Sequence, residues 1–401
     1  MGAIAINRPS LPAKTATRTV LITSTRAPAA LDLARLFAAA GWHVVGADCC
    51  RWPLGKFSIA FAAHARVPSP RHDHRAFAAA IARLIERERV DLLVPTCEEV
   101  FYLAHYHAEL SKLCRLACPP FDVLAALHDK SRLPEMAVGL GIAIPETHLL
   151  QDASNIVERC RRVSDKVVLK PAFSRFANRT LICPDEAAIA ALRPSSAEPW
   201  VCQRYIEGDE YCTYAVAQQG KLTAFAAYRP MHRVGKGSGV LFAPVNSPEL
   251  ERFAASFAAR HALDGQFAFD LIDSPEGSWH VLECNPRATS GVHLFNPEDN
   301  LPSAFFDKPP DVIRPSDPAP KMAALAMLLF GLPQALASRR LPTALANWKA
   351  AHDVIGRNGD YGPSLGQFAA LAENLAKAAH LGCSPLAAST NDIEWNGEAL
   401  A

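Results

Sequence analysis

The segment Glu283-Cys284-Asn285-Pro286-Arg287 places an acidic and an amide side chain at the end of a strand-like run. Asp270 lies near the end of the preceding strand-like run, and Pro275-Glu276-Gly277 supplies the turn between them. Pairing about that turn brings Asp270 close to Glu283, while Glu283 and Asn285 share a face. Three oxygen ligands on one surface suit Mg²⁺, which prefers one or two carboxylates plus substrate phosphates. The alternative is a polar hairpin edge.

Two lysines upstream complement this acidic hairpin. Lys130 precedes a helix expected over about 131–140, and Lys170 ends the apolar strand Val167–Lys170. A lysine at a strand tip is usually just solvated. Two lysines upstream of an acidic triad also fit another role, in which they contact phosphates whose other side a metal holds. The glycine-free loop Pro171–Thr180, which includes Arg175, is predicted to be a mobile lid with donors for phosphate or substrate.

A third segment, Val201–Glu210, is an apolar strand that enters a glycine turn and then a second strand. A purine needs a flat apolar slot, an acceptor for its amino group and hinge backbone groups, and a carboxylate further along can hold the ribose hydroxyls. Gln203, the backbone of Ile206 and Glu210 fit those roles in order. A hairpin with an acidic turn is the alternative interpretation.

In their order along the chain, these segments resemble the motifs of the ATP-grasp superfamily, which includes carboxylate–amine ligases and carbamoyl-phosphate synthase. The similar segments lie within about residues 20–310 and are His128–Leu133 with Gly141–Thr147, Val168–Pro171, Gln203–Glu210 and Glu283–Arg287. The resemblance implies ATP and Mg²⁺ as cofactors, with Mn²⁺ as an alternative metal. It implies phosphate contacts for Lys130 and Lys170 (Lys170 also catalytic), adenine contacts for Gln203 and Ile206, a ribose contact for Glu210, and metal ligation by Asp270, Glu283 and Asn285.

Arginines are the candidates for substrate binding. The resemblance implies that Arg287 is catalytic, stabilising the transferring phosphoryl group, or that it holds the acceptor carboxylate, as its planar fork allows. Arg175 and Arg229 are the further candidates. The basic, glycine-rich segment Arg229–Gly239 is either a flexible lid over the acceptor or a solvated hairpin loop.

The N-terminal part predicts a β-α-β unit. A strand at Thr19–Thr23 is followed by a helix that opens at Pro28, and a second strand spans Trp42–Asp48. The first turn contains no glycine, so the backbone approach that a dinucleotide pyrophosphate needs is missing and NAD binding is improbable. Asp48 is then expected on the surface or between domains.

The expected fold class combines α/β and α+β parts: a Rossmann-like N-terminal partner domain, an ATP-grasp domain and a helical C-terminal extension. The predicted boundaries are a disordered leader over 1–18, the partner domain over 19–125, the ATP-grasp domain over 126–309 and the C-terminal region over 310–401. The segment Asp392–Trp395 is unusually specific for a tail, but nothing in the sequence shows that it returns to the active site.

The charge and cysteine content limit the classes of binding partner that we expect. A net charge of +1 does not favour nucleic acid or an anionic membrane surface. Eleven cysteines without a CxxC pair are typical of a reduced cytoplasmic protein that uses cysteine as a small apolar residue. The expected partners are small-molecule carboxylate and amine substrates, with a homodimer as the candidate assembly.

The expected reaction follows from the implied site. A carboxylate attacks the γ-phosphate of ATP to give an acyl phosphate and ADP, and an amine then displaces phosphate to give an amide. Two alternatives stay open: phosphorylation of bicarbonate or carbamate, as in carbamoyl-phosphate synthase, and a non-catalytic ATP-binding regulatory protein.

Overall fold

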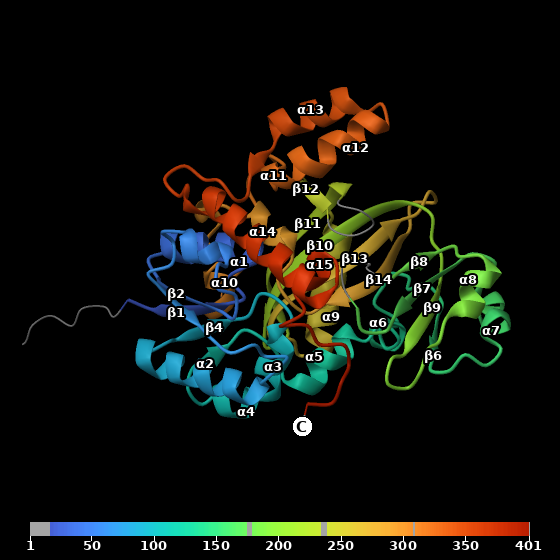
Figure 1. Ribbon diagram of the computed structural model, residues 1–401, viewed down its shortest axis with the longest axis horizontal. Coiled ribbons are helices and arrows are strands. Elements are labelled where there is room, and N and C mark those ends of the chain that lie inside the picture. The colour runs from blue at the N-terminus through green and yellow to red at the C-terminus, as the bar shows by residue number, and fades with distance from the viewer. Residues whose placement is uncertain (1–16, 175–178, 234–238, 308, 401) are drawn as a thin grey trace, which may run out of the picture.

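The computed structural model describes residues 17–174, 179–233, 239–307 and 309–400. Most of the predicted leader, residues 1–16, therefore lies outside the described residues. Three sheets organise the chain, and a helical arm projects from one end (Figure 1). The predicted mixture of α/β and α+β parts with a helical C-terminal segment is confirmed. None of the described helices is both long and apolar enough to cross a bilayer.

The N-terminal sheet is parallel and has the strand order β3-β2-β1-β4-β5. Its β1 strand is buried along its whole length, because helices cover both faces, as parallel sheets require. One face packs on α1 and the other on α2 and α3. The elements are β1 (Thr19–Thr23), α1 (Pro28–Ala39), β2 (His43–Asp48), η1 (Leu54–Phe57), β3 (Ala63–Arg66), α2 (His74–Glu88), β4 (Leu92–Val94), α3 (Glu99–His105), α4 (His107–Leu110), β5 (Arg115–Leu116) and α5 (Phe121–His128).

A smaller antiparallel sheet has the order β6-β9-β7-β8 and packs one face on two helices. The helix expected over about 131–140 is shorter than predicted, because Val138 is extended and Gly139 has a left-handed backbone (φ 74°). The elements of this part are α6 (Leu133–Ala137), β6 (Thr147–Leu150), α7 (Ile156–Val163), β7 (Val167–Pro171), β8 (Leu181–Ile182), α8 (Glu186–Ala191) and β9 (Trp200–Arg204).

The large sheet has the order β14-β13-β10-β11-β12-β15-β16 and is antiparallel except between its last two strands. One face packs on α9, whose N-terminus is capped by the Ser247 side chain. The opposite face turns toward α1 at one end and toward the smaller sheet at the other. The elements are β10 (Asp209–Gln218), β11 (Lys221–Arg233), β12 (Gly239–Val245), α9 (Pro248–Arg260), β13 (Gly265–Asp273), β14 (Trp279–Asn285), η2 (Ser290–Leu294), η3 (Pro297–Asp299) and α10 (Ser303–Phe306).

The C-terminal region first adds two strands to the large sheet and then becomes helical. The C-terminal region was predicted to be helical, but Met322 pairs with Leu241 of β12, and the helical turns begin only at Ala324. An arm of α12 and α13 projects from the body of the molecule, and α14 lies across the body below this arm (Figure 1). The elements are β15 (Lys321–Met322), α11 (Ala324–Ala326), η4 (Met327–Gly331), α12 (Leu332–Ala337), α13 (Leu341–Ala350), β16 (His352–Asp353), α14 (Gly362–Leu381) and α15 (Pro385–Ala388).

The segment that follows α15 docks on the carboxyl ends of the N-terminal strands. The Arg26 guanidinium lies between Asp48, at 2.6 Å, and Asp392, at 2.5 Å. Asp48 was expected either on the surface or between domains. It is only 2% exposed and lies between the N-terminal sheet and the C-terminal tail, so the second expectation fits. Trp395 stacks on Phe101 with a centroid distance of 4.7 Å. The tail thus covers the edge of the sheet where doubly wound folds commonly bind ligands.

Candidate functional site

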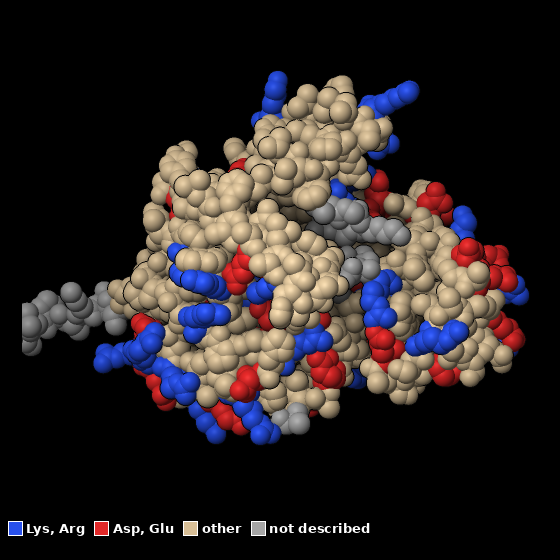
Figure 2. Space-filling model, viewed as in Figure 1, with Lys and Arg blue, Asp and Glu red and all other residues tan. Residues whose placement is uncertain are grey.

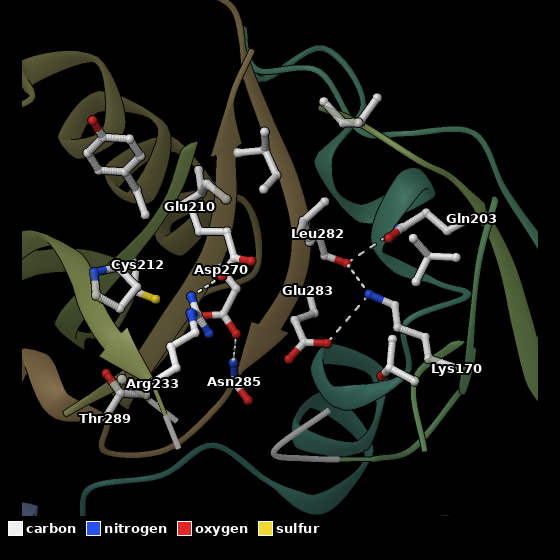
Figure 3. Close-up of a pocket in the computed structure, with 18 of the residues that line it drawn as sticks. Lys170, Gln203, Glu210, Cys212, Arg233, Asp270, Leu282, Glu283, Asn285 and Thr289 are labelled. Atoms are coloured by element: carbon white, nitrogen blue, oxygen red, sulfur yellow. Dashed lines mark hydrogen bonds and ion pairs between the residues drawn. The ribbon is translucent and has the colours of Figure 1, made fainter. Parts of the chain in front are cut away.

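A row of side chains crosses the open face of the large sheet. Asp270 on β13 is directly opposite Glu283 on β14 and directly opposite Cys212 on β10, and Cys212 is in turn opposite Tyr228 on β11. Because successive residues alternate between faces, Asn285 joins this side two residues after Glu283. Figure 3 shows the two carboxylates side by side, with Lys170 reaching toward them from the smaller sheet. The hairpin pairing predicted for the acidic residues is therefore present.

Glu283 is partly buried and lies between two buried lysines, Lys130 and Lys170. Its carboxylate lies 3.6 Å from Lys130 Nζ and 3.6 Å from Lys170 Nζ. Burial alone would raise the pKa of Glu283, but the two ammonium groups lower that pKa to about 2. Burial lowers the pKa of Lys170, and the Glu283 carboxylate opposes that shift. The opposite charges of Glu283 and the two lysines compensate one another in a partly buried environment, where an unpaired charge would be costly.

Asp270 has the opposite environment. Burial, followed by the neighbouring Glu283 carboxylate, raises the pKa of Asp270 to about 6. Its Oδ2 atom accepts a hydrogen bond from the Asn285 amide at 3.1 Å. The Arg287 guanidinium donates to Asn285 Oδ1 at 3.3 Å. A divalent cation would favour the ionised form of both of these partly buried carboxylates and would bind between them.

The two lysine ammonium groups also donate hydrogen bonds to backbone carbonyl groups. Lys130 Nζ donates to the carbonyl of Ser174 at 2.8 Å, and Lys170 Nζ donates to the carbonyl of Leu282 at 3.3 Å. The first bond ties the start of the loop after β7 to the end of α5, and the second ties β7 to β14. Both ammonium groups therefore lie where the small sheet meets the large one.

A cavity of about 320 Å³ lies between these two sheets, within the range of small-molecule sites. Gln203 lines it from β9, and its amide nitrogen donates to Thr147 Oγ1 at 3.0 Å and to the Leu282 carbonyl at 3.4 Å. Ile206 and Glu210 line the same cavity from the hinge and from β10. The hinge residues, one lysine and the acidic hairpin thus share one hollow.

Solved structures resemble the fold of this chain, whereas no protein-family model matches it. N5-carboxyaminoimidazole synthetase from Staphylococcus aureus, complexed with ADP, is similar over 80% of this chain and 86% of its own, with 13% identity and a TM-score of 0.61. L-amino acid ligase from Bacillus licheniformis is similar over 69% and 68%, with 14% identity and a TM-score of 0.51. The biotin carboxylase domain dimer of Hydrogenobacter thermophilus 2-oxoglutarate carboxylase, bound to MgADP, ADP and bicarbonate, is similar over 74% and 71%, with 13% identity and a TM-score of 0.57. This chain has the ATP-grasp fold.

Within the ATP-grasp fold, the predicted site residues divide into three groups. Those that the structure brings together are Lys130, Lys170, Gln203, Ile206, Glu210, Asp270, Glu283, Asn285 and Arg287. Arg229 is not among the residues that line the cavity; its side chain pairs with Asp209. Arg175 lies outside the described residues, as do residues 176–178 of the loop predicted to be a lid.

The segment Arg229–Gly239, predicted to be a lid or a hairpin loop, is strand at both of its described ends. Arg229–Arg233 is the end of β11, and Gly239 opens β12, which pairs with it; residues 234–238 lie outside the described residues. His232 has a left-handed backbone (φ 51°), which interrupts the strand alternation. Arg233 consequently lines the cavity, where it pairs with Glu210. Arg233, not Arg229, is the basic side chain that this segment brings to the site.

The sequence-based prediction also missed the apolar residues of the site. Cys212, Tyr228, Pro230 and Phe242 line the cavity from three neighbouring strands. A signal was available: extending the alternation of β10 from Glu210 places Cys212 on the same face. The residues of β11 and β12 that lie beside Cys212 could not be predicted, because the register between two strands cannot be derived from the sequence of either strand alone.

Proposed function

We propose that this protein is an ATP-dependent ligase, which activates a small carboxylate as an acyl phosphate and joins it to an amine, releasing ADP and phosphate. One observation carries the proposal: two buried lysines and two partly buried carboxylates meet in a cavity between two sheets that also holds the hinge residues. Shared fold alone would not justify an activity, since one fold hosts many functions. The charge arrangement is what supports phosphoryl transfer.

In this proposal the nucleotide lies across the cavity. Gln203 and Ile206 contact adenine, and Glu210 holds the ribose hydroxyls. When the nucleotide binds, the ammonium groups of Lys130 and Lys170 pair with phosphate oxygens instead of with the Glu283 carboxylate. Two of the similar structures are described as complexes with ADP, one of them also with its magnesium salt, which supports ATP and Mg²⁺ in general.

Asp270 and Glu283 would hold the Mg²⁺, or Mn²⁺, since they already face each other on one surface. Asn285 would contribute its oxygen only after its amide rotates, because its nitrogen points to Asp270. No cluster of three or more His, Cys, Asp or Glu side chains suited to a metal occurs among the described residues. This fits an ion completed by substrate phosphates rather than a closed protein cage. When bound, the metal would neutralise charge on the phosphoryl oxygens.

The chemistry needs no covalent enzyme intermediate. A carboxylate oxygen attacks the γ-phosphorus, the bond to the bridging oxygen breaks, and ADP leaves with the electron pair. The amine then attacks the acyl carbon, phosphate departs with the carbon–oxygen bond electrons, and the nitrogen loses a proton. Lys170 stabilises the charge that spreads over the phosphoryl oxygens, and Arg287 holds the carboxylate or the transferring group.

Two other functions compete. Phosphorylation of bicarbonate or carbamate would use the same lysines and carboxylates, and a regulatory protein would bind Mg·ATP without turnover. An ADP-release screen with paired carboxylates and amines separates the three. Release that requires both an acid and an amine supports the ligase, release with bicarbonate alone supports the first rival, and tight nucleotide binding without release supports the second.

We propose further that the protein acts in the cytoplasm as a homodimer and binds neither nucleic acid nor membrane. In α14 the charged Glu373 and Lys377 point inward, toward the backbone of Trp52 and toward Asp392. Large apolar side chains point outward from α14 and from the arm, and a largely uncharged surface covers α12 and α13 (Figure 2). We propose that these apolar side chains form the dimer interface, since the fully buried centre of such an interface is depleted in charged residues. The exposed side chains are Leu328, Leu329, Phe330, Leu336, Leu345, Tyr361, Leu365, Phe368, Leu371 and Leu375.

A further inference from the structure

The cavity floor has two chemically different halves. Glu210, Asp270, Glu283 and Asn285 make it acidic over β10, β13 and β14, on the side of the lysines and the hinge. Cys212 begins a second half, which continues through an aromatic side chain of β11 and another of β12. The boundary between the halves is the cross-strand pair of Asp270 and Cys212, so an apolar surface begins one residue from the acidic hairpin.

The apolar half is rigid and enclosed. Tyr228 and Phe242 are each 4% exposed, and their rings meet edge to face at 5.8 Å. Phe242 also stacks on the ring of His293 at 5.5 Å. Side chains fixed on both sides do not rearrange cheaply, so the shape of this wall selects its ligand.

The Arg287 guanidinium lies near the boundary between the two halves. Arg287 follows β14 and lines the cavity, and its guanidinium donates to Asn285 Oδ1 and to the carbonyl of Ala288. Within the described parts of the chain, no carboxylate lies within ion-pair distance of Arg287, whereas Arg233 already pairs with Glu210. A planar guanidinium of this kind binds an incoming carboxylate through two parallel hydrogen bonds.

We infer that the acid activated by this protein is a carboxylic acid with a compact apolar side chain. This inference rests on the proposed ligase function. Arg287 holds the carboxylate beside Asp270, where the γ-phosphate arrives, and the apolar side chain lies on Cys212, Tyr228 and Phe242. An acid with a charged side chain would be desolvated against this wall, and Arg233, which also lines the cavity, is already paired with Glu210.

The inference is tested by ADP release with Mg·ATP, one amine and a series of acids that have side chains of similar length. We expect kcat/KM to be at least about tenfold higher for apolar side chains than for charged ones. Cys212→Leu should raise KM about tenfold for the larger apolar acids and by less as the acid becomes smaller, because the bulkier leucine side chain fills the pocket. Cys383→Leu, a half-buried position outside the cavity lining, is the matched control.

A binding experiment separates the inference from the ligase proposal. Saturation-transfer NMR with Mg·ADP present measures whether the same acids bind without turnover. If apolar acids bind, and Cys212→Leu weakens the binding of the larger ones while Mg·ADP binding stays intact, the pocket assignment holds even when no acid releases ADP. A preference for charged acids, or apolar acids that neither bind nor turn over, would overturn it.

Discussion

Asp270 and Glu283 face each other across β13 and β14, yet one carboxyl holds its proton to a pKa of about 6 while the other loses it at about 2. The lysines explain the asymmetry, because both lie within 3.6 Å of Glu283. Below about pH 6, Mg²⁺ must displace the proton of Asp270 before the carboxylates of Asp270 and Glu283 can both bind it. The pair therefore links metal binding to pH.

Metal binding should release a proton from Asp270. Because its folded-state pKa is raised above the ordinary 3.8, the stability that this group contributes is present below pH 4 and is lost as pH rises through about 6. Mg·ADP should recover that loss, so its stabilising effect should grow between pH 5 and pH 7. Calorimetry in buffers of different ionisation enthalpy should show about one more proton released at pH 5 than at pH 8. The same extra release from Asp270→Asn would contradict the assignment.

Glu283→Ala should lower kcat by about a hundredfold or more, because it removes a proposed metal ligand and the counter-charge of two buried lysines. The fold should be retained once Mg·ADP supplies phosphates to Lys130 and Lys170. Circular dichroism and ADP release measure the two effects. Glu276→Ala, an exposed acid in the turn of the same hairpin, is the control. Near-normal ADP formation by Glu283→Ala would refute the metal assignment.

The acidic hairpin could be predicted from the sequence because its parts are local. Asp270 and Glu283 lie thirteen positions apart around one turn, and strand alternation adds Asn285. Arg233 could not be found this way, since it reaches the cavity only through the left-handed backbone of His232. The return of the tail to Arg26 was equally invisible, because a contact across more than 300 residues leaves no periodic pattern.

Trp395→Ala should destabilise the protein by about 3 kcal/mol or more, as truncation of a large buried aromatic side chain does. The indole stacks on Phe101 and meets the edge of Phe173, which lies between Lys170 and Ser174 in the loop after β7. Loss of that support should also raise KM for ATP. Urea unfolding and ADP release measure the two effects. Trp395→Phe keeps the ring contacts and should behave nearly as the wild type; equal damage from both variants would argue against the role of stacking.

Leu365→Asp combined with Phe368→Asp should convert the proposed dimer into a monomer, because charges would enter its apolar interface. Both side chains are more than half exposed on the outer face of α14, so the fold should not change. Sedimentation velocity measures the assembly. Leu113→Asp, which alters an exposed apolar residue of the N-terminal part, should leave the assembly unchanged. A monomeric wild type would disprove the dimer.

Arg233→Gln and Arg229→Gln form a matched pair that distinguishes the cavity from its rim. Both arginines pair with acids of β10, Arg233 with Glu210 and Arg229 with Asp209, but only the first pair lines the cavity. Releasing Glu210 from Arg233 changes the carboxylate proposed to hold the ribose, so KM for ATP should shift several-fold in Arg233→Gln. Arg229→Gln should alter neither KM for ATP nor KM for the acid, because exposed ion pairs contribute little. If Arg229→Gln instead raised KM for the acid, Arg229 would be a substrate ligand after all, and β11 would have to move to present it.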